Sequence, residues 1–66
     1  MRQWLIDIRN QQNISQNEIA KKCNITPAYY YMIENGKRNP SVKLAKIIAQ
    51  KMNFDSYSKS WTIFFE

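Results

Sequence analysis

The sequence predicts an all-α protein, a compact domain of five helices that contains a helix-turn-helix. Three observations support this prediction. Apolar residues recur at helical spacing along most of the chain. Residues that commonly begin helices precede four of the five apolar stretches. Asn24, which tolerates a left-handed conformation, separates the second stretch from the third. A chain of 66 residues has room for one domain (1–66) with one modest core.

The first helix is expected over residues 2–12, with Leu5 and Ile8 facing inward. Polar residues occupy the other side of this helix, which is therefore expected to face solvent. Trp4 has two interpretations, because an indole ring can cover the edge of a core or stay partly exposed.

The second helix is expected over residues 16–23. Ser15 precedes it and Glu18 follows three positions later, which is the pattern of a capping box. Ile14 and Ile19 stand at the positions of a hydrophobic staple across the same helix start. These features together fix where the helix begins.

The third helix is expected over residues 27–34, with Thr26 as its N-cap. Pro27 occupies the first helical position, where a missing N–H costs nothing. Ile25 and Tyr30 form its staple pair.

The second and third helices have the spacing of a helix-turn-helix, whose second helix enters the major groove of DNA. Ala20 is small enough for two helices to cross closely, and Asn24 suits the tight turn between them. The inward positions of the two helices are apolar: Ile19, Cys23, Ile25, Tyr30 and Ile33. The alternative is an ordinary helical hairpin packed on itself, but caps, turn residue and apolar spacing together favour DNA binding.

A fourth helix is expected from the N-cap Ser41 to about Met52. Gly36 is the expected left-handed stop of the helix before it, and Pro40 cannot continue that helix. The core candidates of this fourth helix are Val42, Leu44, Ala45, Ile48 and Met52.

The C-terminal segment after Met52 combines serines with aromatic residues. Ser58 or Ser60 is expected to cap a short fifth helix over about 58–65. One interpretation is that Phe54 and Trp61 close the open end of the core. A second is that apolar side chains of this helix form a dimer interface, with Trp61, Phe64 and Phe65 as the candidates.

The amino-acid composition favours some classes of function and excludes others. The net charge of +5 and the pI near 9.6 favour a polyanionic partner. The single cysteine fits a reducing compartment and we expect a cytoplasmic protein, since no apolar run is long enough for a membrane span. Histidine is absent, only one glycine is present, and no carboxylate pair is evident. We therefore expect neither an enzyme nor a metal, cofactor or small-molecule site.

Several strings of the sequence resemble the lambda-repressor-like (Cro/cI, XRE-type) helix-turn-helix family over roughly residues 2 to 53. They are Ile8-Arg9, Ile14-Ser15-Gln16, Glu18-Ile19-Ala20 and the run from Ile33 to Ser41 (IENGKRNPS). The resemblance implies a five-helix domain that binds operator DNA, usually as a two-fold dimer, and regulates transcription. The aromatic C-terminal segment resembles the ending of small phage and mobile-element regulators, although its serine-rich spacer is longer than expected.

The resemblance also implies roles for individual residues. Arg9 and Glu34 match a buried ion pair of the family and are assigned to structure. Gln16 matches a phosphate anchor, and a helix N-terminus independently suits an anion. The other residues expected to contact phosphate are Tyr29, Asn35, Lys37, Arg38 and Lys43.

Base readout is expected from the third helix, at Pro27, Ala28, Tyr31 and Met32. The family positions among these hold Pro27, Ala28 and Met32, none of which makes the bidentate hydrogen bonds of Gln, Asn or Arg to purines. Contacts with thymine methyl groups and recognition of DNA shape are therefore expected. The first hypothesis is a small phage-type or mobile-element-type repressor that binds a two-fold operator as a homodimer. The alternative is an antitoxin-like or protein-interaction module that binds a partner protein through the apolar third helix or the aromatic segment.

Overall fold

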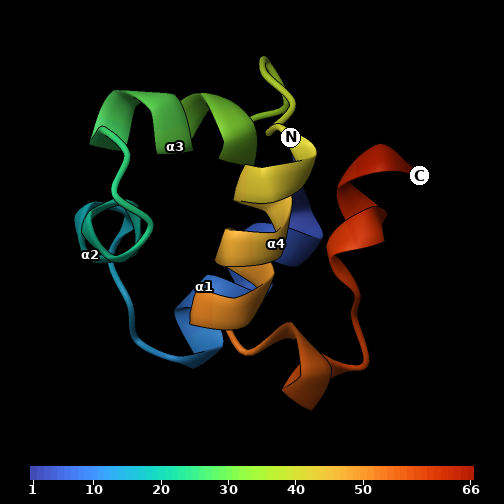
Figure 1. Cartoon of the computed structure of the whole chain (residues 1–66). Coiled ribbons are helices and arrows are strands. Elements are labelled where there is room, and N and C mark those ends of the chain that lie inside the picture. Colours follow the sequence, from blue (N-terminus) through green and yellow to red (C-terminus); the bar gives the residue numbers. More distant parts are fainter.

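The computed structural model describes all 66 residues and contains helices but no strand. The four α-helices are α1 (Gln3–Gln11), α2 (Gln16–Lys22), α3 (Pro27–Glu34) and α4 (Val42–Lys51). Two short 3₁₀ helices follow, η1 (Phe54–Tyr57) and η2 (Trp61–Phe65). In Figure 1, α3 lies across one end of the molecule and α4 runs beneath its C-terminal end.

The short fifth helix predicted over about 58–65 is not an α-helix, and only its second part is helical, as the 3₁₀ helix η2. Asn53 and Ser58 both adopt left-handed conformations, with φ of 54° and 56°, and they turn the chain on either side of η1. Ser60, and not Ser58, starts the last helix, because its side chain accepts a hydrogen bond from the Thr62 N–H over 3.4 Å. This part of the chain is therefore two short 3₁₀ turns, the form that short helical pieces commonly take.

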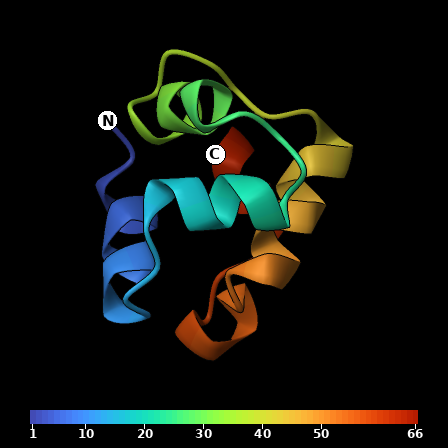
Figure 2. The ribbon, with the colours of Figure 1, turned by 90° about the vertical axis from the view of Figure 1, so that its left-hand side faces the viewer.

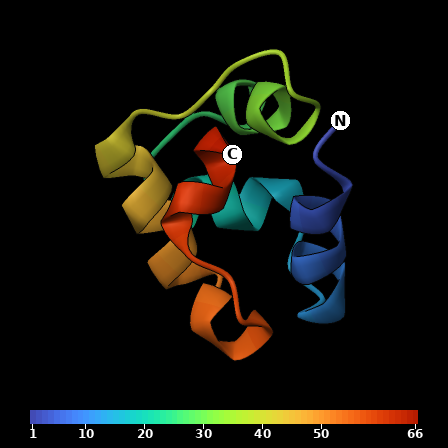
Figure 3. The same ribbon diagram turned by 90° about the vertical axis from the view of Figure 1, so that its right-hand side faces the viewer.

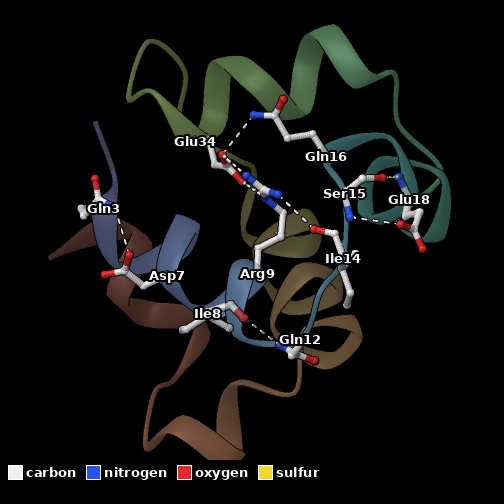
Figure 4. Close-up of polar contacts among 10 residues, drawn as sticks. All are labelled: Gln3, Asp7, Ile8, Arg9, Gln12, Ile14, Ser15, Gln16, Glu18 and Glu34. Carbon is white, nitrogen blue, oxygen red and sulfur yellow. Dashed lines mark hydrogen bonds and ion pairs between the residues drawn. The ribbon is translucent and has the colours of Figure 1, made fainter.

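Local side-chain caps begin α2, α3 and α4 as predicted. The capping box at the start of α2 is complete, since Glu18 N–H donates to Ser15 Oγ and Ser15 N–H donates to Glu18 Oε1, both over 3.1 Å (Figure 4). Thr26 caps α3 and Ser41 caps α4, each over 3.1 Å. Each capping side chain accepts a backbone N–H that has no partner inside the helix, and this fixes where the helix begins.

Left-handed residues end the first three helices. Asn13, Asn24 and Gly36 follow α1, α2 and α3 with φ of 55°, 58° and 85°. In each case the next N–H donates to a carbonyl one turn back, which completes a Schellman motif. These bonds run from Ile14 to Arg9 (3.3 Å), from Ile25 to Ala20 (3.0 Å) and from Lys37 to Met32 (2.9 Å).

One apolar core connects the helices. Figure 2 shows α2 crossing the molecule with α3 above it, and in Figure 3 the C-terminal segment runs beside α4, against which η2 packs. The buried apolar residues are Leu5, Ile8, Ile19, Ala20, Cys23, Tyr30, Ile33, Leu44, Ala45, Ile48, Met52, Phe54 and Phe64. Val42 was predicted in this core, but it is 51% exposed because it lies in the first turn of α4, outside the buried stripe.

Aromatic rings close the core where α1 meets the C-terminal segment. Trp4 is half-buried and packs edge-on against Phe54 and Phe64, with ring centroids 5.8 and 5.2 Å apart. Phe54 and Phe64 stack on each other at 5.9 Å. Of the two interpretations of Trp4, the structure therefore supports the one in which the indole covers the edge of the core.

Candidate nucleic-acid interface

The outer face of α3 is exposed to solvent. Tyr31 and Met32 are 54% and 38% exposed, and Pro27 and Ala28 at the start of the helix are also exposed. On the opposite face Tyr30 and Ile33 are fully buried. The α2–α3 packing thus holds the helix by one side, and the four residues expected to read bases lie on the surface.

The loop after α3 presents cationic side chains beside the C-terminal end of that helix. Lys37 and Arg38 are exposed, and Asn35 is half-buried. The Asn35 side-chain oxygen accepts the Lys37 N–H over 3.2 Å, while the Lys37 and Arg38 N–H groups also donate to the Met32 carbonyl. These bonds give the loop a defined backbone, so that its charges are held close to α3.

A cation–π contact connects this loop to α3. The Arg38 guanidinium carbon lies 5.2 Å from the ring centroid of Tyr29. Tyr29 is half-buried, so one part of the ring packs on the core and another carries the guanidinium. The structure therefore brings together two residues that were expected to contact phosphate separately.

A buried carboxylate connects α1, α2 and α3. Glu34 is 2% exposed and accepts a hydrogen bond from Arg9 Nε over 2.6 Å and one from Gln16 Nε2 over 3.1 Å (Figure 4). The Arg9 Nη1 also donates to the Ile14 carbonyl over 3.0 Å. The hydrogen bond and charge of Glu34 raise the pKa of Arg9, against the opposing effect of burial.

Gln16 occupies the first position of α2, where it was expected to anchor a phosphate. Its amide nitrogen uses one N–H for Glu34, which leaves a second N–H to donate elsewhere. Sequence reasoning did not find this bond, since a polar residue at a helix start carries no signal for a partner 18 residues away.

Comparison with known proteins decides the family. The family model described as helix-turn-helix matches residues 5–56. This chain belongs to the XRE-type helix-turn-helix family. The HTH-type transcriptional regulator YqaF of Bacillus subtilis strain 168 is 50% identical over 66 residues, which is all of this chain and 80% of YqaF. An HTH-type transcriptional regulator of Archaeoglobus fulgidus is 38% identical over 53 residues, or 80% of this chain and 75% of that protein. No solved structure is a significant match.

The family and these relatives are DNA-binding transcriptional regulators of the helix-turn-helix type. None of the helices of this chain combines the length and the apolar character that crossing a membrane requires.

Lys43, another expected phosphate contact, is exposed in the first turn of α4.

The aromatic segment of the regulator differs from its prediction. Phe64 is only 4% exposed because it fills the core between Trp4 and Phe54, so it cannot serve as a dimer contact. Trp61 is half-buried, and the Lys46 ammonium lies 5.0 Å from its ring centroid in a cation–π contact. Phe65 is 47% exposed, so Phe65 and the exposed part of Trp61 remain as candidates for a dimer contact.

Arg2 is a residue of the regulator that sequence reasoning missed. Its guanidinium donates to the carbonyls of Ile33 and Arg38 over 2.5 and 3.1 Å, and to the side-chain oxygen of Asn39. No local pattern indicates these contacts, because the partners lie 31 to 37 residues away in the chain.

Proposed function

We propose that this regulator is a repressor of the phage or mobile-element type, which binds a two-fold DNA operator as a homodimer with α3 in the major groove. The observation that carries the proposal is the exposed outer face of α3 beside the cationic loop of residues 35–38. Base contacts come from the exposed face, and phosphate contacts come from the loop and from Gln16.

Apolar groups dominate the proposed base contacts. Ala28 and Met32 present only hydrocarbon and a thioether to the groove, which suits the C5 methyl of thymine. Tyr31 adds a hydroxyl that can donate or accept at a base edge or a phosphate. Specificity then depends on thymine methyl groups and on the shape of the DNA more than on bidentate hydrogen bonds.

Dimerisation is proposed through the exposed part of the C-terminal segment, with Phe65 and the accessible side of Trp61 as the contacts. The two rings lie edge-on with centroids 6.2 Å apart and form a small apolar surface. Two-fold symmetry in the protein would require half-sites about one helical turn apart in the operator. Sedimentation of wild type and Phe65→Ser should show a dimer only for the former at the same concentration.

Selection of bound sites from random duplex DNA tests the function directly. The wild type should enrich a palindrome, and its affinity for that palindrome should fall steeply as salt is raised. Enrichment of no sequence, or affinity that is independent of salt, would contradict the proposal.

A second candidate function is that of an antitoxin-like or interaction module. The exposed Phe65 and the apolar Met32 favour it, since both could contact a partner protein. Co-purification of a stoichiometric partner would support this function, whereas tight operator binding by the protein alone would contradict a pure interaction module.

A further inference from the structure

Arg2 joins the residue before α1 to the end of α3 and to the loop that follows it, 31 to 37 residues away in the sequence. Its Nη1 donates both to the Ile33 carbonyl, in the last turn of α3, and to the Arg38 carbonyl in the following loop. Its Nη2 donates to the Asn39 side chain, one residue further on. The acceptors therefore lie before and after Lys37, and the guanidinium closes the loop at both ends.

The backbone of Arg2 strengthens the same connection. Its N–H donates to the Glu34 carbonyl over 2.7 Å. Carbonyls in the last turn of a helix have no intrahelical partner. Here Arg2 donates to those of Ile33 and Glu34, and the Ile33 carbonyl also accepts the Gly36 N–H over 3.3 Å. The residue before α1 thus completes the end of α3.

The aromatic core supports the guanidinium from its other side. The Arg2 guanidinium carbon lies 5.5 Å from the ring centroid of Phe64. Arg2 is half-buried, and this burial lowers the pKa of its guanidinium. The side chain is therefore held in place and is not a solvated surface arginine.

We propose that Arg2 is a positioning residue for DNA binding, which holds the loop of residues 35–39 so that Lys37 and Arg38 face the phosphate backbone. This inference rests on the proposed function. A loop that is ordered before binding loses less conformational freedom when its side chains contact DNA. Only an arginine fits, because its planar fork of donors reaches several acceptors at once whereas an ammonium is a point donor.

Affinity for the enriched operator tests the role of Arg2 in a double-mutant cycle. Arg2→Ala should weaken binding about tenfold, the effect of disordering two contacting side chains. Lys37→Ala should then cost clearly less in the Arg2→Ala background than in the wild type, because the loop no longer presents the lysine. Lys51→Ala, which removes one exposed charge at the end of α4, is the matched control.

Conservative replacement separates positioning from charge. Arg2→Lys keeps the charge but not the fork, and it should recover less than half of the lost binding free energy. Additive effects of Arg2→Ala and Lys37→Ala would overturn the inference. Wild-type affinity in Arg2→Lys, or an Arg2→Ala effect no larger than that of Lys51→Ala, would overturn it as well.

Amide hydrogen exchange tests the inference without DNA. The Lys37 and Arg38 N–H groups, both bonded to the Met32 carbonyl, should exchange faster in Arg2→Ala. The Ile25 N–H, bonded to the Ala20 carbonyl in a comparable motif, should keep its rate. Equal acceleration at all three amides, or no acceleration, would overturn the positioning role. If the wild type enriches no DNA while the loop amides still respond, the proposed function fails and the structural role of Arg2 stands.

Discussion

Arg9 and Glu34 form an ion pair that joins α1 to the last residue of α3, with Arg9 Nε and Glu34 Oε2 2.6 Å apart. Their side chains are only 13% and 3% exposed. The same carboxylate accepts the Gln16 amide, so one buried charge fixes the relative positions of three helices. The family resemblance assigns this pair to structure and not to DNA contact, which the replacement of Glu34 tests.

Replacing Glu34 should therefore affect folding before it affects DNA recognition. Glu34→Ala leaves Arg9 without its partner in a buried position and should lower the free energy of unfolding by about 3–5 kcal/mol. Urea denaturation measures this change. Asp7→Ala, at an exposed carboxylate of α1 that bonds only Gln3, should change stability by less than about 0.5 kcal/mol. Equal stability of the two variants, with DNA binding lost only in Glu34→Ala, would assign Glu34 to the interface instead.

The turn between α2 and α3 depends on Asn24 and its φ of 58°. Alanine in this conformation places Cβ close to a carbonyl oxygen, so Asn24→Ala should destabilise the fold by about 1 kcal/mol. Asn24→Gly should match or exceed wild-type stability, since glycine adopts positive φ without a steric cost. Thermal melts of the two variants side by side measure the difference. The same loss in both would mean that the asparagine side chain, and not the backbone conformation, stabilises the turn.

Local features of the sequence predicted the four α-helices well. Ser15, Thr26 and Ser41 cap helices, and Asn24 and Gly36 end them, because each role needs only the residue and its near neighbours. Helical spacing also separated the buried face of α3 from its exposed face. The residues expected to contact bases could therefore be placed on the outer face of α3 from local features alone.

Contacts between distant residues could not be predicted in the same way. Phe64 has the same apolar spacing in the sequence whether it fills the core of its own chain or contacts a partner. Its burial depends on where Trp4 and Phe54 lie in the folded protein. Ser58 is not a residue that usually adopts positive φ, so its left-handed conformation between η1 and η2 could not be predicted. The network of Arg2 likewise depends on how the N-terminus meets the loop after α3.

Stability should decrease at alkaline pH because of Tyr30. Burial, followed by the adjacent Glu34 carboxylate, raises the pKa of its hydroxyl above the ordinary value near 10. Above about pH 10 the unfolded chain loses this proton while the folded protein keeps it, so unfolding releases a proton and stability falls by up to about 1.4 kcal/mol per pH unit. Burial also raises the pKa of Cys23, which starts a similar loss from about pH 8.5.

Tyr30→Phe tests this pH dependence. The Tyr30 hydroxyl is buried without a hydrogen-bond partner, so its removal should leave stability at pH 7 unchanged or higher. Denaturant melts from pH 7 to 11 should show a shallower alkaline decline for Tyr30→Phe than for the wild type. Tyr31→Phe, at an exposed position of the same helix, should retain the wild-type decline. An identical decline in Tyr30→Phe and wild type would assign it to other groups.

Lys37 should contribute one phosphate contact to operator binding. Lys37→Ala should reduce the slope of log affinity against log salt by roughly one, because one fewer counterion is released. The loss should be nearly uniform across operator sequences, since a phosphate contact carries no base information. Lys51→Ala should keep the wild-type slope, as Lys51 ends α4 away from α3 (Figure 1). Equal slopes for wild type and Lys37→Ala would remove the loop from the phosphate contacts.

Met32 should recognise a thymine methyl group, because its exposed thioether is on the outer face of α3 and has no hydrogen-bond donor to offer. Replacing the contacted thymine by uracil deletes only that methyl and should weaken wild-type binding roughly fourfold, the equivalent of about 0.8 kcal/mol for one buried carbon. Met32→Ala should bind the thymine and uracil operators with nearly equal affinity. Testing each thymine of the enriched site in turn, with Tyr31→Phe as a control that keeps Met32, locates the contact. If no thymine shows this dependence on Met32, thymine readout by Met32 is wrong, and recognition must come from Ala28, from DNA shape or from the tyrosine hydroxyls.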